Sequence, residues 1–263
     1  MAALISRTQS TLRRVHIELL SKPLPLRVAI YLHEVEGQMW PAFRKMVEYL
    51  RDAGYRFVDP DAFLQATDRV AFLSLDDNYR SWWTALPLLD ELGVVATFYV
   101  NTCAFRDRAH PAEVEAYFDR LHFHGERVPL STTELREIAA AGHVVGAHGH
   151  SHSILAALPA AEAREDIAVS KRLLEDLLGQ EVPHFSYPYG MRRHFKKDLR
   201  AFCRSIGFRT VSNAIPGMQF ARQRAHQIHR SIWRLNAPLA VNLENLRADG
   251  RLFERLTGRS ALG

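Results

Sequence analysis

Residues 142–152 read Gly-His-Val-Val-Gly-Ala-His-Gly-His-Ser-His, a short β-branched run followed directly by three histidines. The run predicts a strand that ends where the histidines begin. His148 and His152 are four residues apart, so on a helical turn both imidazoles would project from one face, with Cβ atoms about 5–6 Å apart. That separation suits two nitrogens that bind one metal at about 2.0–2.1 Å. We predict a metal site rather than the alternative, a loop of hydrogen-bonded or solvent-facing histidines.

A pair of acidic residues lies at the end of another expected strand. Asp76 and Asp77 follow the apolar run 70–75, Val-Ala-Phe-Leu-Ser-Leu. Adjacent carboxylates repel one another unless something neutralises them. A metal on one and a proton-transfer task for the other would explain the pair, whereas alone it is typical of a turn or a helix cap. Parallel α/β folds collect their ligands at the carboxyl ends of strands, which favours the functional interpretation.

A third strand end carries Phe185-Ser186-Tyr187-Pro188-Tyr189-Gly190. Pro188 and Gly190 restrict the backbone to an unusual path, which could aim a main-chain N–H at a developing oxyanion. Taken alone, the motif is a generic turn.

The wider pattern alternates short apolar runs with longer helical segments, which predicts βα units around a mainly parallel sheet. Expected strands are 27–32, 70–75, 94–100, 143–147, 184–187 and 208–212. Expected helices include 81–92, one opened by the capping box at 131–134, and a last one over 239–256. We expect a single domain over 1–263, with a core at about 27–215, an N-terminal extension at 1–26 and a closing segment at 216–263.

Composition places the chain among ordinary globular proteins, because 47% of residues are hydrophobic and 24% charged. The net charge of +5 is uneven: residues 191–263 hold 15 Lys and Arg against 4 Asp and Glu, and residues 1–190 hold 19 against 25. A basic last quarter suits an anionic group, a membrane surface or nucleic acid, or is simply a solvated face. We expect no nucleic-acid partner, because no nucleic-acid-binding motif is present. The oligomeric state is not predicted.

Targeting and cysteine patterns are uninformative. Cys103 and Cys203 belong to no metal-thiolate motif, and no apolar run approaches the roughly 18 residues of a membrane span. Residues 1–22 lack a secretory signal pattern. We expect a cytoplasmic protein whose first segment docks on its own fold or touches a membrane peripherally.

Taken in order, the three strand-end motifs resemble the polysaccharide deacetylase family, also called the NodB-homology domain or carbohydrate esterase family four. Residues 74–79, Ser-Leu-Asp-Asp-Asn-Tyr, are similar to its first motif, and residues 142–152 to its second. Residues 185–190 resemble the third motif of the branch that reads FxYPYG. The segments 31–33 and 53–58 are similar to upstream family segments. The resemblance covers about residues 27–215.

The resemblance implies an α/β fold, a distorted (β/α) barrel of about seven strands. It implies one divalent metal ion, zinc or another first-row ion, held by Asp77, His148 and His152. Asp76 then matches the general base that takes a proton from water, and the main-chain N–H of Tyr189 matches an oxyanion donor. Further residues expected to bind substrate are Tyr187, Pro188, Asn78, Tyr79 and His150.

Four departures from the family pattern bear on activity. Gly149 replaces a Ser or Thr whose hydroxyl would brace the histidine loop, and His150 is an added imidazole. Ser186 replaces an Arg that contacts the base in many members, so we expect Asp76 to be less firmly anchored. The late histidine that serves as general acid is not clearly present, and His229 is the candidate in its place.

The expected substrate is an N-acetylated amino sugar in a polysaccharide, a glycan precursor or a carrier-linked sugar, with the basic last quarter near a phosphate of the carrier. Two alternatives stay open: the same site could hydrolyse another C–N bond, such as a formamide, cyclic imide or ureide, or the chain could be a non-catalytic descendant.

Overall fold

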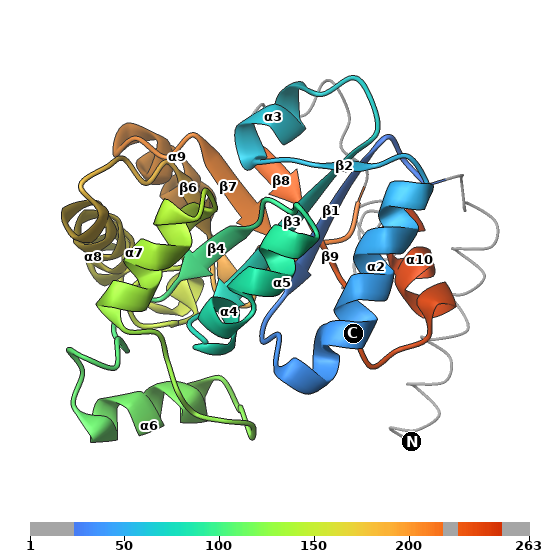
Figure 1. Cartoon of the computed structure of the whole chain (residues 1–263). Coiled ribbons are helices and arrows are strands. Elements are labelled where there is room, and N and C mark those ends of the chain that lie inside the picture. The colour runs from blue at the N-terminus through green and yellow to red at the C-terminus, as the bar shows by residue number, and fades with distance from the viewer. Residues whose placement is uncertain (1–23, 218–225, 249–263) are drawn as a thin grey trace, which may run out of the picture.

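The protein folds around a barrel-like sheet with helices on its outside (Figure 1). The computed structural model describes residues 24–217 and 226–248. Its strands are β1 (Arg27–Leu32), β2 (Arg56–Phe57), β3 (Val70–Asp77), β4 (Thr97–Val100), β5 (Val144–Ala147), β6 (His184–Ser186), β7 (Thr210–Asn213), β8 (Gln227–His229) and β9 (Ser231–Ile232). Its α-helices are α2 (Trp40–Asp52), α3 (Pro60–Gln65), α4 (Ser81–Thr84), α5 (Leu86–Glu91), α6 (Pro111–Arg120), α7 (Thr132–Ala140), α8 (Ala160–Leu178), α9 (Lys197–Ser205) and α10 (Leu239–Arg247). Three 3₁₀ turns are η1 (Gly37–Met39), η2 (Leu155–Ala157) and η3 (Arg192–His194).

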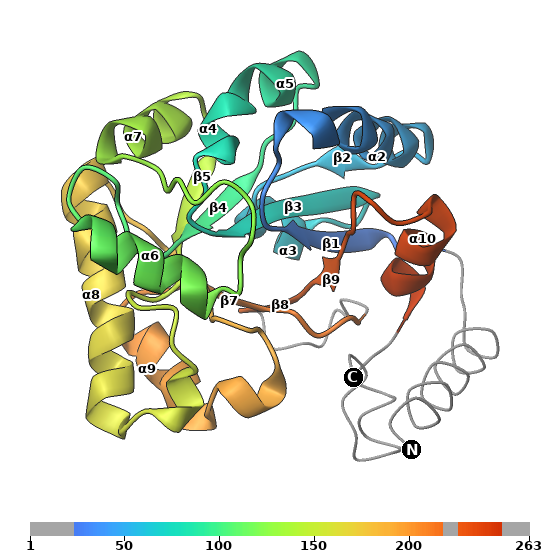
Figure 2. The same cartoon turned by 90° about the horizontal axis from the view of Figure 1, so that it is seen from below.

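The strands follow the order β8-β7-β6-β5-β4-β3-β1-β9, with β2 paired to β3, and all pairs are parallel. β8 pairs with β7 at one edge, β9 pairs with β1 at the other, and Arg230 alone separates β8 from β9. The chain therefore bridges the two edges within one residue, and Figure 2 shows β8 and β9 between β7 and β1. The expected (β/α) barrel is confirmed. Its sheet has nine strands rather than about seven, and the short strands β2, β8 and β9, of two or three residues each, are the ones that the sequence pattern does not predict.

β3 pairs with β1, β2 and β4 and is buried along its whole length. All eight of its residues are buried, because helices cover the outer face and side chains fill the interior. The strand ends at Asp76 and Asp77, which places both carboxylates at the barrel mouth beside the ends of β4 and β1.

One helix begins with the predicted capping box, and another expected helix is divided in two. Ser131 and Glu134 form the predicted capping box at the start of α7. The helix expected over 81–92 is instead two short helices, α4 and α5, joined at Ala85. Pro87 lacks the N–H that a continuous helix would require there, so the break lies next to it.

Two sequence expectations fall partly or wholly outside the described residues. The last helix, expected over 239–256, is described only as α10, and the segment 1–22 is not described. Within the described parts, no helix has the length and apolar character needed to cross a bilayer.

Candidate active site

Three side chains from two strand ends meet at the barrel mouth. His148 and His152 each direct Nε2 at Asp77 Oδ1, at 3.5 and 3.2 Å. Their potential ligand atoms all lie within 4.8 Å of one another, and all three residues are buried. They form the one such cluster of three or more His, Cys, Asp or Glu within the described residues. The structure thus brings together the ligand set that the sequence predicts.

The hydrogen bonds around this cluster fit a cation. His148 Nδ1 lies 2.8 Å from the carbonyl oxygen of Ser186, which can only accept, so Nδ1 carries the proton. In the neutral imidazole, Nε2 then carries no proton, and its lone pair faces the carboxylate oxygen of Asp77. Two acceptors facing each other in a buried site are unfavourable unless a cation lies between them. One carboxylate and two imidazoles are ligands that zinc and related first-row ions accept, and they leave positions open.

The two imidazoles converge through an irregular loop rather than through the helical turn expected from their spacing. Residues 148–153 form no helix, and Gly149 has φ +76°. Asp166 on α8 holds this loop: its carboxylate accepts from the main-chain N–H groups of His150 and Ser151 at 2.8 and 2.9 Å. The loop is therefore braced, but by a carboxylate from α8 in place of the missing hydroxyl.

This brace also explains the glycine in the histidine motif. A Cβ on Gly149 would lie 2.6 Å from Asp166 Oδ1, closer than real Cβ contacts come. A side chain at 149 would therefore displace the carboxylate that holds the loop, in addition to the cost of the left-handed backbone.

Backbone strain is concentrated at this site. Four described non-glycine residues have positive φ, namely Asp77, His122, His152 and Tyr189, and all four line the same pocket. Such conformations persist only where surrounding contacts enforce them, and they are typical of functional sites.

Asp76 is firmly held, which corrects the expectation drawn from Ser186. Arg230 forms a bidentate ion pair with it, Nη1 to Oδ1 at 2.6 Å and Nη2 to Oδ2 at 2.7 Å. Ser186 Oγ accepts from Arg230 Nη2 at 2.7 Å. An arginine that contacts Asp76 is thus present, but it comes from the closing segment, and the small Ser186 leaves room for it.

All five donors of Arg230 are used. Besides Asp76 and Ser186, they reach Ser74 Oγ at 2.8 Å and the carbonyl oxygen of Asn213 at 3.0 Å. The rings of Tyr31 and Tyr99 lie 5.0 and 5.2 Å from the guanidinium carbon. A fully buried guanidinium is tolerated because every N–H is bonded and the charge is paired.

These charges set the protonation of both carboxylates. Burial alone would raise the pKa of Asp76, but Arg230 and His148 outweigh it and the pKa lies below its ordinary value. Burial also opposes the ionisation of Asp77, yet His152 and His148 bring its pKa well below the usual range. Both carboxylates are therefore ionised at neutral pH.

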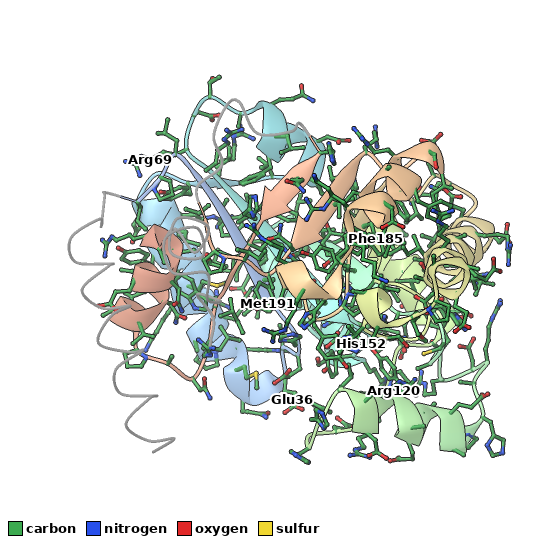
Figure 3. All side chains as sticks on the ribbon, turned by 180° about the vertical axis from the view of Figure 1, so that it is seen from behind. Glu36, Arg69, Arg120, His152, Phe185 and Met191 are labelled. Carbon is green, nitrogen blue, oxygen red and sulfur yellow. The ribbon has the colours of Figure 1, made fainter. Side chains whose placement is uncertain are left out.

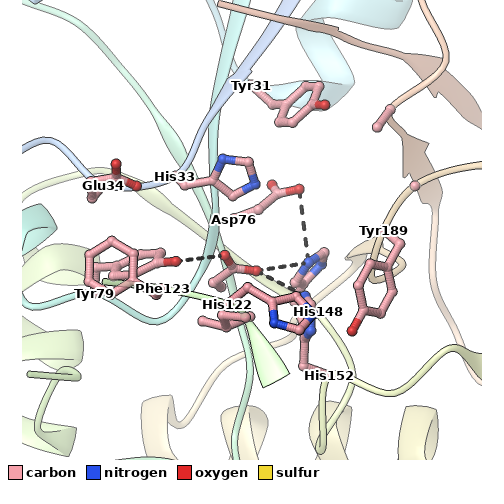
Figure 4. A pocket seen from close by; sticks show the side chains of 14 residues that line it. Tyr31, His33, Glu34, Asp76, Tyr79, His122, Phe123, His148, His152 and Tyr189 are labelled. Carbon is pink, nitrogen blue, oxygen red and sulfur yellow. Dashed lines mark hydrogen bonds and ion pairs between the residues drawn. The ribbon is translucent and has the colours of Figure 1, made fainter. Parts of the chain in front are cut away.

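The site opens into a pocket of about 270 Å³ (Figure 4). Its floor is formed by Asp76, Asp77, His148 and His152, and one wall by residues 121–123 after α6. Arg120 fastens that wall to the histidine loop, because its Nε donates to the carbonyl oxygen of Ser151 at 3.2 Å. Figure 3 shows Arg120 between α6 and His152. The long connection 101–130 thus shapes the pocket.

The other residues predicted to act in the site lie in different places. Tyr189 lines the pocket, and its main-chain N–H has no partner among the described residues. Tyr79 also lines it, and its hydroxyl donates to Asp77 Oδ2 at 3.1 Å, so it holds that carboxylate in place. Neither Tyr187 nor Pro188 lines the pocket: both are buried, and Tyr187 stacks on Phe195 at 4.4 Å.

Three more predicted residues lie outside the pocket lining. Asn78 is fully buried and bonds the main chain of Asn101 and Leu130, so it holds the loop rather than facing substrate. His150 Nδ1 lies 2.9 Å from Thr102 Oγ1. His229, the candidate general acid, is buried with its ring 3.2 Å from the Asn213 amide.

Three residues of the site were missed by sequence reasoning. Arg230 directly follows His229, and nothing in the pattern around it marks a buried arginine. Asp166 is one acidic residue among several on a helix. His33 follows β1 directly, and its place at a strand end was the signal that could have identified it.

Comparison with known proteins agrees with this geometry. The sequence profile of the polysaccharide deacetylase family matches residues 64–211, which is more than half of the chain. YxkH of Bacillus subtilis (strain 168), assigned to the polysaccharide deacetylases, is 23% identical over 221 residues, 80% of this chain and 71% of YxkH. The chain therefore belongs to the polysaccharide deacetylase family.

Solved structures show the same fold. The Streptococcus pyogenes deacetylase PplD, solved in complex with acetate, superposes with a TM-score of 0.65 at 16% identity, covering 84% of this chain and 98% of PplD. The deacetylase domain of BpsB from Bordetella bronchiseptica gives 0.62 at 17% identity, covering 80% and 97%.

Proposed function

We propose that this protein is a metal-dependent hydrolase that removes the N-acetyl group from an amino sugar in a polysaccharide, a glycan precursor or a carrier-linked sugar. One observation carries the proposal: the pocket floor joins an Asp77–His148–His152 ligand set to a second carboxylate, Asp76, that Arg230 holds in place. Because the three possible metal ligands and the second carboxylate are all present, an active hydrolase is favoured over a non-catalytic descendant.

Each residue has a separate task. A divalent metal held by Asp77, His148 and His152 would polarise the acyl carbonyl and lower the pKa of a water molecule. Asp76, ionised and fixed by Arg230, accepts the proton of the attacking water. The main-chain N–H of Tyr189 donates to the oxyanion that forms as water adds to the carbonyl.

The pocket lining indicates what the substrate presents there. It contains three carboxylates and four imidazoles but neither Lys nor Arg. A neutral acylated sugar suits this lining better than a phosphate does. If the substrate has an anionic carrier, that group lies outside the pocket, toward the basic segment 192–197 that follows Tyr189.

The test is release of acetate from N-acetylated amino sugars, offered free, nucleotide-linked and lipid-linked, with zinc added. We expect Asp76→Asn to lower turnover by about 10²–10⁴-fold, the usual contribution of a general base. Equal acetate release by Asp76→Asn and the unmodified chain would overturn the proposed base. Release of formate from a formamide, without acetate from any amino sugar, would favour the related C–N hydrolase instead.

A further inference from the structure

We propose that Glu34 forms a subsite for a protonated sugar amine beside the place where the acyl group is cleaved. The preferred substrate is then an amino-sugar chain in which a sugar next to the N-acetylated one already has a free amine. The inference rests on the proposed function and names the substrate class of that site.

The backbone on both sides of Glu34 is fixed by contacts with α4. The main-chain carbonyl of His33 accepts from Trp82 Nε1 at 2.7 Å, and the main-chain N–H of Val35 donates to Ser81 Oγ at 3.1 Å. Val35 itself is buried. Glu34 lies between these two contacts and lines the pocket. Its carboxylate therefore enters the pocket from a fixed backbone position.

The carboxylate of Glu34 is the one in the lining that the described residues leave uncommitted. Asp76 is paired with Arg230, and Asp77 accepts from Tyr79 and faces two imidazoles. Glu34 is half-buried, and none of the described residues forms a hydrogen bond or an ion pair with it. A carboxylate partly removed from water is stabilised by a donor or a cation, and the lining has neither Lys nor Arg. A ligand in the pocket can supply that cation.

The two sides of the pocket differ in charge. Figure 4 shows Glu34 and Tyr189 on opposite sides of Asp76. On the Glu34 side, segment 33–39 has two glutamates and no Lys or Arg, whereas segment 191–197, which follows Tyr189, has four Lys and Arg and no acidic residue. A cation is attracted to the first side and repelled by the second. A neutral hydroxyl gains nothing from this asymmetry, which favours an ammonium group as the occupant.

Aromatic rings next to Glu34 complete the subsite. Phe123 and Tyr79 both line the pocket, with ring centroids 4.9 Å apart. The charge of Glu34 reaches these rings: after burial and the Asp77 carboxylate, it contributes to raising the pKa of the Tyr79 hydroxyl. The face of an aromatic ring attracts a cation as well. The carboxylate and the rings together fit an amine carried on a sugar.

The proposed reaction itself produces the group that this subsite binds. Hydrolysis of one N-acetyl group leaves a free amine on the sugar, and that amine is protonated in neutral solution. When the next N-acetylated sugar enters the site, the amine formed before it can pair with Glu34. The subsite therefore favours removal of acetyl groups from neighbouring sugars of one chain.

Two trisaccharides test the proposal, one of N-acetylglucosamine alone and one in which a single sugar has a free amine. With zinc added, we expect the unmodified chain to show a kcat/KM for acetate release about tenfold higher on the second trisaccharide, the usual effect of a charged hydrogen bond. About 1 M NaCl should reduce this preference by screening. Glu34→Gln should remove it, because glutamine keeps the shape and the hydrogen bonds but not the charge, and Glu34→Asp should retain part of it.

Glu36→Gln is the matched control. Glu36 lies two residues further along the same segment, but its carboxylate bonds Gln38 and it does not line the pocket. The variant should show the preference of the unmodified chain. Equal kcat/KM for both trisaccharides in the unmodified chain, or a preference that survives in Glu34→Gln, would overturn the subsite and leave the proposed function standing.

Calorimetric binding of the glucosamine trisaccharide, which has no acetyl group to lose, provides a readout without turnover. Glu34→Gln should bind it about tenfold more weakly than Glu36→Gln does, and equal binding by the two variants would contradict the subsite. If the unmodified chain releases acetate from no amino sugar, the proposed function fails, and this binding measurement alone decides the subsite.

Discussion

The guanidinium of Arg230 and the carboxylate of Asp76 form a bidentate pair at 2.6 and 2.7 Å, although 154 positions separate them in the chain. Asp76 is the penultimate residue of β3, and Arg230 is the single residue between β8 and β9, where the two edges of the barrel meet. The residue at which the chain passes from one edge of the sheet to the other is therefore also the residue whose side chain orients the proposed base.

Replacement of Arg230 by Met should be strongly destabilising. It leaves the Asp76 carboxylate buried without its counter-charge, and loss of one partner of a buried pair costs about 3–5 kcal/mol. The free energy of unfolding in urea at pH 7 measures this. Adding Asp76→Asn to Arg230→Met should recover part of the loss, because the uncompensated charge is then gone.

Arg44→Met is the matched control for that series. Arg44 pairs with Glu91 at 2.6 Å on the surface, where solvent screens the interaction. Its loss should change the free energy of unfolding little. If Arg230→Met unfolded at the same urea concentration as Arg44→Met, the buried pair would not have the importance assigned to it.

Asp166→Ala should weaken metal binding without removing a ligand. The carboxylate organises the main chain at His150 and Ser151, between the two ligating histidines, and loss of an outer partner of metal ligands typically costs about 10–100-fold in affinity. Calorimetric titration with zinc measures the change. Asp176→Ala, an exposed acidic residue on the same helix, is the control and should bind zinc normally. Equal affinities for the two variants would contradict a role for Asp166.

Zinc should stabilise the folded protein through the predicted ligands. A free zinc concentration 100 times Kd adds about 2.7 kcal/mol to the free energy of unfolding, because only the folded chain presents the site. The midpoint of thermal unfolding should rise accordingly, and a chelator should reverse the rise. His152→Ala should abolish the effect and His150→Ala should keep it; a zinc-induced rise that persists in His152→Ala would refute this ligand assignment.

Stability should fall in mild acid because of His184 at the opposite end of the barrel. Burial, more than any nearby charge, lowers its pKa from 6.5 to about 4, so below pH 6.5 the unfolded chain binds a proton that the folded chain does not. The loss accumulates between about pH 6.5 and 4 and is on the order of 2–3 kcal/mol.

Urea unfolding at pH 7 and pH 4.5 tests this, with His184→Asn as the comparison. The variant should lose less stability between the two pH values, since it has no imidazole to protonate. An unchanged pH difference would mean that other groups cause the acid sensitivity.

Much of the ligand set could be predicted because its signals are local. Asp77, His148 and His152 each follow an apolar run that reads as a strand, and parallel strands bring their carboxyl ends to one edge of a sheet. The geometry of the histidine loop could not be predicted in the same way. Spacing predicts a helical turn, whereas Asp166 holds an irregular loop, and a contact between separate elements leaves no mark in the spacing.

The sequence by itself predicted the βα barrel and a metal site at the histidines, since both depend on strand ends and on residues close in the chain. The assignment of Asp77 as a proposed ligand and Asp76 as the proposed base came from the family resemblance. Only the tertiary structure decided what surrounds them. Arg230 reaches Asp76, and His33 reaches the pocket, because sheet closure brings β9 beside β1 and the β8–β9 junction over the barrel interior. These contacts depend on strand pairing between segments that are far apart in the chain. The local pattern around Ser186 instead predicted that Asp76 would be less firmly anchored.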